Sequence, residues 1–121
     1  MIVRCAIFEG TVRDGEQERF DALIMEQLVP LIRKFPRIIE VQVNRNLWTE
    51  AGAPPIYLML QLWFQTEKDL EVALASPERA ASRNKAMEIL PMFEGRVYHM
   101  NFLHMDRREP LQSKDQQGST A

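Results

Sequence analysis

Apolar residues along this chain gather in short runs and in helical stripes. Four runs, at residues 2–8, 38–48, 56–64 and 96–105, have the length and the β-branched and aromatic content that predict strands. Between the first two runs, apolar residues recur at spacings of three and four from Phe20 to Phe35, which predicts one face of an amphipathic helix. A second helical region is expected over residues 66–90, so the predicted order of elements is β-α-β-β-α-β.

Capping and stop signals set the expected bounds of the first helix. Asp14 followed by Gln17 resembles a capping box and predicts that the helix begins near Glu16. Pro30 is expected to kink the helix or to end it before a final turn, and Pro36 is expected to stop it.

Similar signals frame the second helical region. Thr66 with Asp69 has the spacing of a capping box, and Ser76-Pro77-Glu78 predicts a new start with serine as N-cap and proline at the first helical position. Pro91 is expected to end this region. Residues 9–15 and 93–95 are predicted to form turns beside the first and last strands.

The order of elements is that of the split βαβ arrangement, in which each crossover is right-handed. The first and third strands should lie in the middle of the sheet, because they are nearly apolar on both faces while the second and fourth carry polar residues. We therefore expect an α+β, ferredoxin-like sandwich with a four-stranded antiparallel sheet and the helices on one face. Residues 1–105 form the expected domain, and residues 106–121 are expected to be a mobile polar tail.

One face of the predicted sheet is left without helices. Residues at alternate positions of the third strand are expected to face the helices: Leu58, Leu60, Leu62 and Phe64. The helix-free face is expected to carry Phe8, Tyr57, Met59 and Trp63. At about 25 cal/mol per Å² of apolar surface, exposing this set forfeits several kcal/mol, and monomers rarely keep such a patch. We expect a second copy to cover it, giving a homodimer through the helix-free face.

Composition narrows the classes of function. The chain has 121 residues, 45% of them hydrophobic, and a formal net charge of −2, which fits one soluble domain and argues against a nucleic-acid partner. The apolar run at residues 56–64 has strand length and is too short to cross a bilayer, and the first residues do not resemble a secretion signal. The lone Cys5 lies in an apolar run and is read as a core residue rather than a nucleophile, which is compatible with a cytoplasmic location.

Three short motifs carry a resemblance to a known family. They are Pro54-Pro55-Ile56-Tyr57 at the start of the third strand, Ser76-Pro77-Glu78, and Phe93-Glu94-Gly95-Arg96-Val97. Over about residues 1–105 the chain resembles the EthD-type proteins of the dimeric α/β-barrel superfamily. The resemblance implies two chains that close a barrel around a pocket, and members linked to catabolic or polyketide gene clusters. It implies no agreed set of catalytic residues for these positions.

The candidate site residues are those expected to face the inside of the barrel. The polar candidates are Arg4, Gln42, Asn44, Gln61, His99 and Asn101, and the aromatic ones are Phe8, Tyr57, Trp48 and Trp63. Side chains of the last strand alternate between the two faces of the sheet. We assign one set to the inside of the barrel (Val97, His99, Asn101 and Leu103) and the other to the face covered by the helices (Tyr98, Met100 and Phe102).

His99 is the candidate general base or acid, because the pKa of a histidine lies near neutrality. Arg4, Asn101 or Tyr57 would hold a developing oxyanion. The alternative for His99 is an edge-strand histidine that bonds to its neighbours, and Arg4 could equally be satisfied by Glu40, Gln42 or Gln61. Trp63 and Tyr57 could stack on an aromatic ligand or simply form a dimer core.

The sequence points to no metal and no cofactor. His99 and His104 are five residues apart, so they lie on opposite faces of a strand and cannot chelate one ion within a chain. No phosphate loop, dinucleotide fingerprint or nucleophile elbow occurs. Haem binding through His99 has no support beyond that one residue.

Two functions remain open at this point. The first is a cofactor-free enzyme of oxygenase, isomerase or cyclase type that acts on a small aromatic or polyketide-like molecule in the barrel pocket. The second is a non-catalytic module that binds a small organic molecule. The sequence alone does not decide between them.

Overall fold

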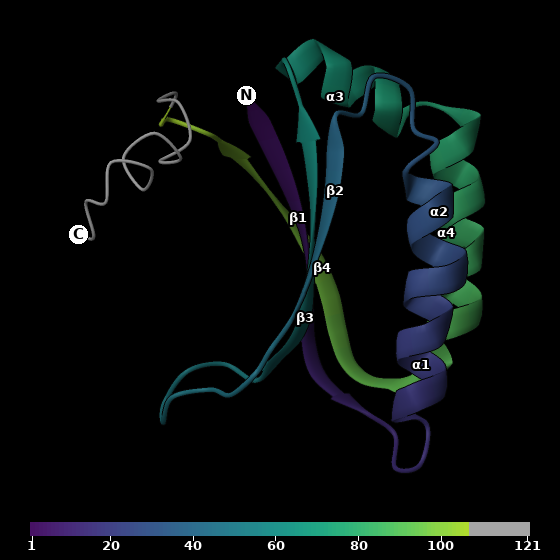
Figure 1. Cartoon of the computed structure of the whole chain (residues 1–121), viewed down its shortest axis with the longest axis vertical. Coiled ribbons are helices and arrows are strands. Elements are labelled where there is room, and N and C mark those ends of the chain that lie inside the picture. The colour runs from purple at the N-terminus through teal and green to yellow at the C-terminus, as the bar shows by residue number, and fades with distance from the viewer. Residues whose placement is uncertain (107–121) are drawn as a thin grey trace, which may run out of the picture.

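The computed structural model describes residues 1–106, and the predicted tail falls almost entirely outside the described residues. Four strands, β1 (Ile2–Val12), β2 (Glu40–Arg45), β3 (Ile56–Phe64) and β4 (Phe93–Leu103), form one antiparallel sheet in the order β2-β3-β1-β4. Figure 1 shows all the helices on one side of this sheet. The predicted α+β ferredoxin-like architecture is therefore confirmed, with the first and third strands in the middle.

The first helical region runs through Pro30 by way of a π-helical turn. The segments are α1 (Gln17–Leu23), η1 (Ile24–Leu28), which is π-helical, and α2 (Val29–Ile32). In an α-helix the ring of Pro30 would clash with the carbonyl four residues earlier. The π-helical turn ends at Leu28, two residues before this proline, and widens the helix there. The helix thus continues past Pro30 to Ile32, which was one of the two expected outcomes.

Two of the three expected helix starts are capped as predicted. The Thr66 hydroxyl accepts a hydrogen bond from the Asp69 amide at 3.1 Å at the start of α3 (Glu67–Leu74). The Ser76 hydroxyl accepts one from the Arg79 amide at 3.2 Å at the start of α4 (Pro77–Ile89). A short 3₁₀ turn, η2 (Leu90–Met92), follows α4.

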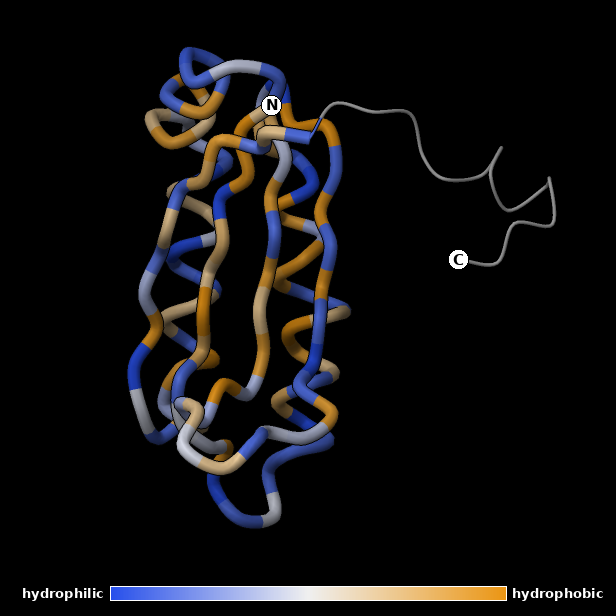
Figure 2. The backbone as a smooth tube through the Cα atoms, turned by 90° about the vertical axis from the view of Figure 1, so that its left-hand side faces the viewer, coloured by the Kyte–Doolittle hydropathy of each residue, from blue (hydrophilic) through white to orange (hydrophobic). Residues whose placement is uncertain are grey.

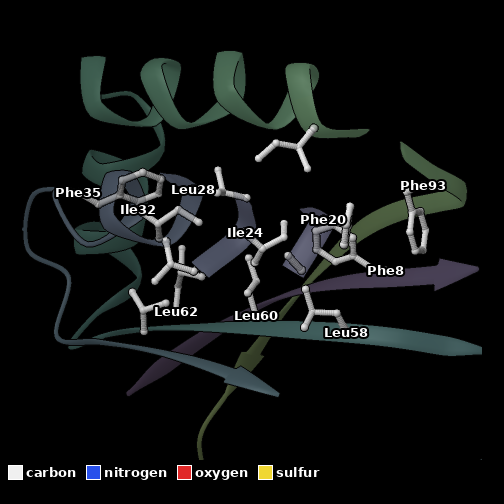
Figure 3. Close-up of a cluster of buried hydrophobic side chains, with 14 of the residues drawn as sticks. Phe8, Phe20, Ile24, Leu28, Ile32, Phe35, Leu58, Leu60, Leu62 and Phe93 are labelled. Carbon is white, nitrogen blue, oxygen red and sulfur yellow. The ribbon is translucent and has the colours of Figure 1, made fainter. Parts of the chain in front are cut away.

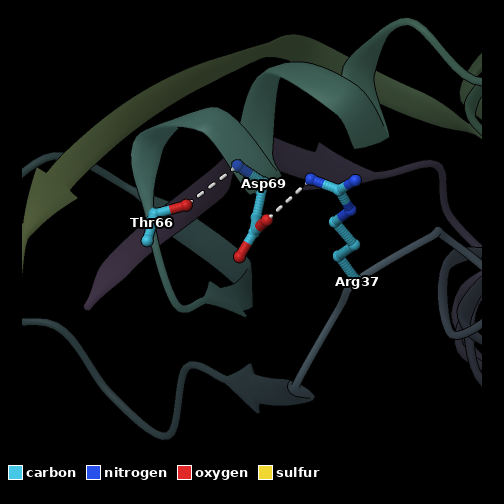
Figure 4. A network of polar contacts seen from close by, with 3 residues as sticks. All are labelled: Arg37, Thr66 and Asp69. Carbon is cyan, nitrogen blue, oxygen red and sulfur yellow. Dashed lines mark hydrogen bonds and ion pairs between the residues drawn. The ribbon is translucent and has the colours of Figure 1, made fainter.

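Asp69 also ties α3 to the chain that leads into β2. Its carboxylate accepts a hydrogen bond from the Arg37 guanidinium at 3.1 Å, as Figure 4 shows. The negative charge of Asp69 lies in the first turn of α3, where it interacts favourably with the positive end of the helix dipole.

The predicted capping box of Asp14 and Gln17 is wrong. Glu16 is the N-cap of α1, and no side chain caps this end. A backbone bond from the Glu16 amide to the Arg13 carbonyl, at 3.0 Å, forms the turn instead. A backbone turn between β1 and α1, rather than a side chain, therefore sets where α1 begins.

Strands β1 and β4 extend into the two predicted turns. Thr11 pairs with Glu94 and Val12 with Phe93, so residues 9–12 and 93–95 are strand. The extension depends on Gly10 and Gly95, which lie directly opposite each other with φ angles of 142° and 149°. A Cβ added to Gly95 would lie 2.0 Å from the Glu9 carbonyl oxygen, and one added to Gly10 would lie 2.1 Å from that of Glu94. Only glycine permits the two backbones to approach this closely.

Register with β1 decides which side chains face the helices. Leu58, Leu60, Leu62 and Phe64 of β3 are buried beneath the helices, as predicted. Their partners on β1 are Phe8, Ala6, Arg4 and Ile2, so this set of β1 also lies on the helix side. Figure 3 shows Phe8 in the core beside Phe20 and Phe93. The prediction that Phe8 lies on the helix-free face is therefore wrong; β1 is apolar on both faces, and alternation alone could not choose between them.

Tyr57 is also on the helix side, contrary to prediction. A bulge between Phe8 and Glu9 shifts the register at the start of β3. The Tyr57 ring lies 5.8 Å from Phe20 and 6.2 Å from Phe93, within the helix-side core.

The two faces of β4 are the reverse of those predicted. Val97, His99, Asn101 and Leu103 pair with the helix-side residues of β1, so they face the helices. The opposite side of the sheet, here called the open face, is formed by alternating residues of three strands: Val3, Cys5, Met59, Trp63, Tyr98, Met100 and Phe102. Figure 2 looks onto this face. Met100 and Phe102 are 42% and 46% exposed there.

Replacing Gly95 with Ala tests the close pairing of β1 and β4. We expect a loss of about 3 kcal/mol or more in the free energy of unfolding, because the substitution combines a glycine-only φ with overlap of backbone atoms. Gly52→Ala is the control: Gly52 has a φ of 88° but no atom within 4 Å of an added Cβ, so it should cost only about 1 kcal/mol. Urea unfolding measures both, and equal losses would contradict the role given to the close approach.

Candidate functional site

A cavity of about 390 Å³ lies between the sheet and the helices. Its floor is formed by β1, β3 and β4, and its walls by η1, α2 and α4. Most of the lining is apolar, including Phe8, Leu60 and Leu62 from the sheet and Ile24 and Leu28 from the π-helical turn. A small number of polar groups interrupt it: Arg4, Arg79, Ser82, Arg83 and His99. Apolar walls with few polar groups are typical of small-molecule sites of this size.

Arg4 is held in the cavity by the neighbouring edge strand. It pairs with Asn101 across β1 and β4, and its Nη1 donates a hydrogen bond to Asn101 Oδ1 at 3.0 Å. Burial and the charge of Arg79 lower the pKa of Arg4. The partners considered from the sequence, Glu40, Gln42 and Gln61, lie on the other side of the sheet. Asn101 therefore acts as a positioning residue for the guanidinium.

His99 lies on the edge strand two residues from Asn101 and lines the same cavity. Burial of its ring, followed by the charges of Arg4 and Arg79, lowers the pKa of His99 to about 4. The side chain keeps contact with solvent at the sheet edge, which screens part of this effect. At neutral pH the imidazole is uncharged, so one ring nitrogen carries a free lone pair that can accept a proton.

Helix α4 contributes polar groups that the sequence analysis missed. Arg79 and Arg83 are one turn apart and both line the cavity. Between them, Ser82 is buried and its hydroxyl donates a hydrogen bond to the Arg79 carbonyl at 2.8 Å. A sequence signal was present, because two arginines at positions i and i+4 share a helix face with Ser82 and Ala86 next to the core.

Four of the predicted ligand residues lie on the open face and do not reach the cavity. Trp63 Nε1 donates to Gln42 Oε1 at 3.3 Å, and Asn44 Nδ2 donates to Gln61 Oε1 at 3.4 Å. The Trp63 ring also contacts His104, with centroids 5.1 Å apart. The expectation that all candidate residues share one surface is wrong. The sheet separates this set from Arg4, His99 and Asn101.

The three remaining aromatic candidates have different places, and Trp48 lies in the segment between β2 and β3, where it is 70% exposed. Phe8 lines the cavity, whereas Tyr57 does not. The Tyr57 hydroxyl donates to the Asp21 carboxylate at 2.6 Å, and Asp21 also pairs with Arg45 at 3.0 Å. Burial and Asp21 raise the pKa of Tyr57. Tyr57 is therefore a structural link between β3 and α1 rather than a group that faces a ligand.

Other classes of site find little support in the described part of the chain. No group of three or more histidine, cysteine or acidic side chains within residues 1–106 could hold a metal ion. Cys5 is buried, and burial raises the pKa of its thiol, which is the environment of a structural cysteine. Over the same residues, no helix has the length and apolar character that a bilayer-spanning segment requires. The cytoplasmic location stays a prediction.

We predict a pKa of about 4 for His99 when its imidazole resonances are titrated by NMR. Arg4→Gln removes a neighbouring charge and should raise this pKa part of the way toward 6.5, while Arg19→Gln, at an exposed position of α1, should not change it.

The same shift predicts a dependence of stability on pH. The pKa of His99 in the folded chain lies below its value of 6.5 in the unfolded chain, so the unfolded chain binds more protons between these values. The contribution of neutral His99 is complete above about pH 6.5 and is lost as the pH falls toward 4. A His99→Gln variant should show a flatter stability profile over this window, and an unchanged profile would contradict the assignment.

Comparison with known proteins identifies the fold. No protein-family model and no curated protein matches the sequence. Among solved structures, a protein of the ethyl tert-butyl ether D (EthD) family from Bacillus halodurans is similar with a TM-score of 0.73 and 24% identity, over 87% of this chain and 99% of that one. SnoaB from Streptomyces nogalater, described as a cofactor-independent oxygenase, is similar with a TM-score of 0.56 and 16% identity, over 89% and 94%.

A third structure has a related description. It is a dimeric protein of unknown function and ferredoxin-like fold from Bacteroides fragilis, similar with a TM-score of 0.55 and 18% identity, over 84% of this chain and 94% of that one. These similarities cover nearly all of the described residues, and they include an EthD family protein as the resemblance in the sequence implied. The chain has a ferredoxin-like fold, similar to the folds of an EthD family protein and of a protein described as a cofactor-independent oxygenase.

Proposed function

We propose that this protein is an EthD-like, cofactor-free enzyme that abstracts a proton from a small aromatic or polyketide-like molecule bound between the sheet and the helices. One observation carries the proposal: an uncharged His99 and the guanidinium of Arg4 line the same largely apolar cavity. The description of SnoaB as a cofactor-independent oxygenase agrees with this reaction class.

The two groups supply complementary parts of the reaction. His99 accepts a proton from an acidic C–H or O–H group of the bound molecule. Arg4, positioned by Asn101, stabilises the negative charge that develops on the neighbouring oxygen. The resulting enolate or phenolate can isomerise, attack a carbonyl in a cyclisation, or react with molecular oxygen as the oxidant. The residues on this chain support the proton transfer that these three reactions share.

The low pKa of His99 places a condition on this mechanism. A base with a pKa near 4 accepts protons weakly, so it operates well only when negative charge offsets Arg4 and Arg79, whether the ligand already carries that charge or develops it on the reacting oxygen. The same observation favours a second candidate function, a module that binds its ligand without chemistry. In that case His99 is a neutral hydrogen-bonding group in the pocket wall.

Deuterium exchange separates the two functions without knowledge of the natural substrate. The probe is 2-tetralone, a cyclic ketone fused to a benzene ring with acidic C–H groups beside its carbonyl, incubated with the protein in D₂O and followed by proton NMR. We expect the protein to accelerate exchange and His99→Ala to reduce the acceleration by about 100-fold or more.

His104→Ala is the matched control, because His104 contacts Trp63 on the open side of the sheet. It should leave exchange unchanged. Binding of the ketone without exchange would contradict the enzyme and support the binding module. Absence of binding, measured by calorimetry, would contradict both.

We infer that a second copy of the chain covers the open face. Met100, Phe102 and Trp63 form part of an apolar surface there, and burying it at about 25 cal/mol per Å² offsets the cost of association. The similar Bacteroides fragilis protein is described as dimeric. Contact through this face would leave the cavity on the opposite side of each sheet, so each chain would keep its own pocket.

A charge placed on the open face should dissociate the dimer. We expect Phe102→Asp to shift the mass measured by light scattering at micromolar concentration from two chains to one. Met25→Asp is the control, because Met25 lies on the helical layer and is also 46% exposed. A wild-type monomer, or an equal effect of both substitutions, would contradict the assignment of the interface.

A further inference from the structure

The cavity collects positive charge in a chain that is acidic overall. Three arginines, Arg4, Arg79 and Arg83, line it, and no aspartate or glutamate does. The formal net charge of the whole chain is −2. Low-dielectric walls around charges of one sign focus their field into the cavity and favour ions of the opposite sign.

None of these three arginines forms an ion pair with any residue in the described part of the chain. The ion pairs found there use four other cations: Arg37, Arg45, Lys85 and Arg96. Arg4 has Leu62 and Asn101 as its cross-strand neighbours and bonds to the amide of Asn101. The guanidinium therefore has a hydrogen-bond acceptor but no compensating charge.

The placement of Arg79 and Arg83 is unfavourable for the helix that carries them. They are one turn apart on α4, and like charges at this spacing destabilise a helix. The positions three and four residues away from either one hold alanine, serine, methionine or the other arginine, and no acid. Burial and then the charge of Arg79 lower the pKa of Arg4, as expected when like charges on the helix and the sheet face each other across the cavity. A bound anion would relieve this repulsion.

We propose that the natural ligand joins an aromatic or alicyclic body to a carboxylate, with the carboxylate on Arg4 and Arg79 and the body against Phe8, Leu60 and Leu62. This inference rests on the proposed function, because it assumes that a small organic molecule occupies the cavity. Two guanidinium groups from opposite walls match the two oxygens of a carboxylate, and Arg83 adds a third positive charge at the same wall.

A carboxylate fits the lining better than a phosphate. Phosphate sites commonly use free backbone amides at a helix N-terminus or a glycine-rich loop. The cavity lining contains no glycine, and the amide of Arg79, in the first turn of α4, already donates a hydrogen bond to the Ser76 hydroxyl at 3.2 Å. The Ser82 hydroxyl donates to the Arg79 carbonyl and is not free to donate to a phosphate oxygen.

The anion also meets the condition on His99. The charged groups that face His99 are Arg4 on β1 and Arg79 and Arg83 on α4, with no acidic group among the lining residues. A carboxylate bound to the arginines cancels part of their effect, so the pKa of His99 rises and the imidazole becomes a stronger base once the ligand is in place. Ligand charge would then assist proton transfer as well as binding.

A series of naphthalene probes tests the charge requirement by calorimetry at pH 7 and near-physiological salt. The probes are 2-naphthoate, the neutral 2-naphthamide of the same shape, and 2-naphthyl phosphate. We expect 2-naphthoate to bind about tenfold or more tightly than 2-naphthamide, since charge-assisted bonds to arginine are lost with the amide. Equal affinity for the two, or tighter binding of the phosphate, would overturn the carboxylate assignment.

The failure of this inference is distinguishable from that of the proposed function. Equal binding of the amide and the carboxylate, with exchange of 2-tetralone intact, overturns only the preference for the carboxylate. Failure of all the probes and of the ketone to bind overturns the proposed function and this inference together.

Arg79→Gln provides the second measurement. We expect it to reduce the affinity for 2-naphthoate about tenfold and to leave that for 2-naphthamide unchanged. Its melting temperature should equal or exceed that of the wild type, because the substitution removes repulsion within α4. Arg19→Gln removes the same charge from exposed α1 and should leave both affinities unchanged.

His99 itself reports the bound charge. Its pKa, followed by NMR, should rise when 2-naphthoate is added and should not rise with 2-naphthamide. Retained preference for naphthoate in Arg79→Gln, or an unmoved pKa of His99 in the saturated complex, would overturn the placement of the carboxylate.

Discussion

The close pairing of β1 with β4 at Gly10 and Gly95 is the constraint on which the rest of the structure depends. Two facing glycines let the backbones approach to a distance that no side chain permits, and this extends both strands beyond their apolar segments. Because successive residues of a strand alternate between faces, this one register assigns every side chain of β4 to a side of the sheet. It places His99 and Asn101 on the helix side of the sheet with Arg4, and it places Met100 and Phe102 on the open face. A shift by one residue would exchange the two sets.

The cavity contains charged and polar side chains that an apolar core does not stabilise. Arginines in an apolar pocket are stable only when hydrogen-bonded, and Asn101 provides this for Arg4. Burial of the ring and the charges of Arg4 and Arg79 lower the pKa of His99 and favour its uncharged form. The lining therefore carries an excess of positive charge when the pocket is empty. A ligand that carries negative charge would compensate part of this excess. Binding and the basicity of His99 would be linked through the same two guanidinium groups.

The sheet separates two surfaces with different physical character. The helix side holds the main core and a cavity with convergent polar groups, while the open face is an apolar surface bordered by amides of Gln42, Asn44 and Gln61. A partner on the open face would not enter the cavity. Association and ligand binding can thus vary independently, which a single shared surface would not allow.

The sequence by itself determined the order of elements, the two capped helix starts at Thr66 and Ser76, and the central places of β1 and β3. These follow from local periodicity, local hydrogen bonding and the polarity of edge strands, all of which can be read within a few residues. It also singled out His99, Arg4 and Asn101, since polar residues in apolar strands are conspicuous.

Tertiary structure alone decided which face each of these residues occupies. β1 and β4 offer no clean alternation to choose a face, and the choice is made by long-range pairing between strands that are more than 80 residues apart in sequence. The bulge that turns Tyr57 toward the core is a property of the paired strands as well. Arg79 and Arg83 join the site for the same reason: a helix face acquires a function only when packing brings it over a particular part of the sheet.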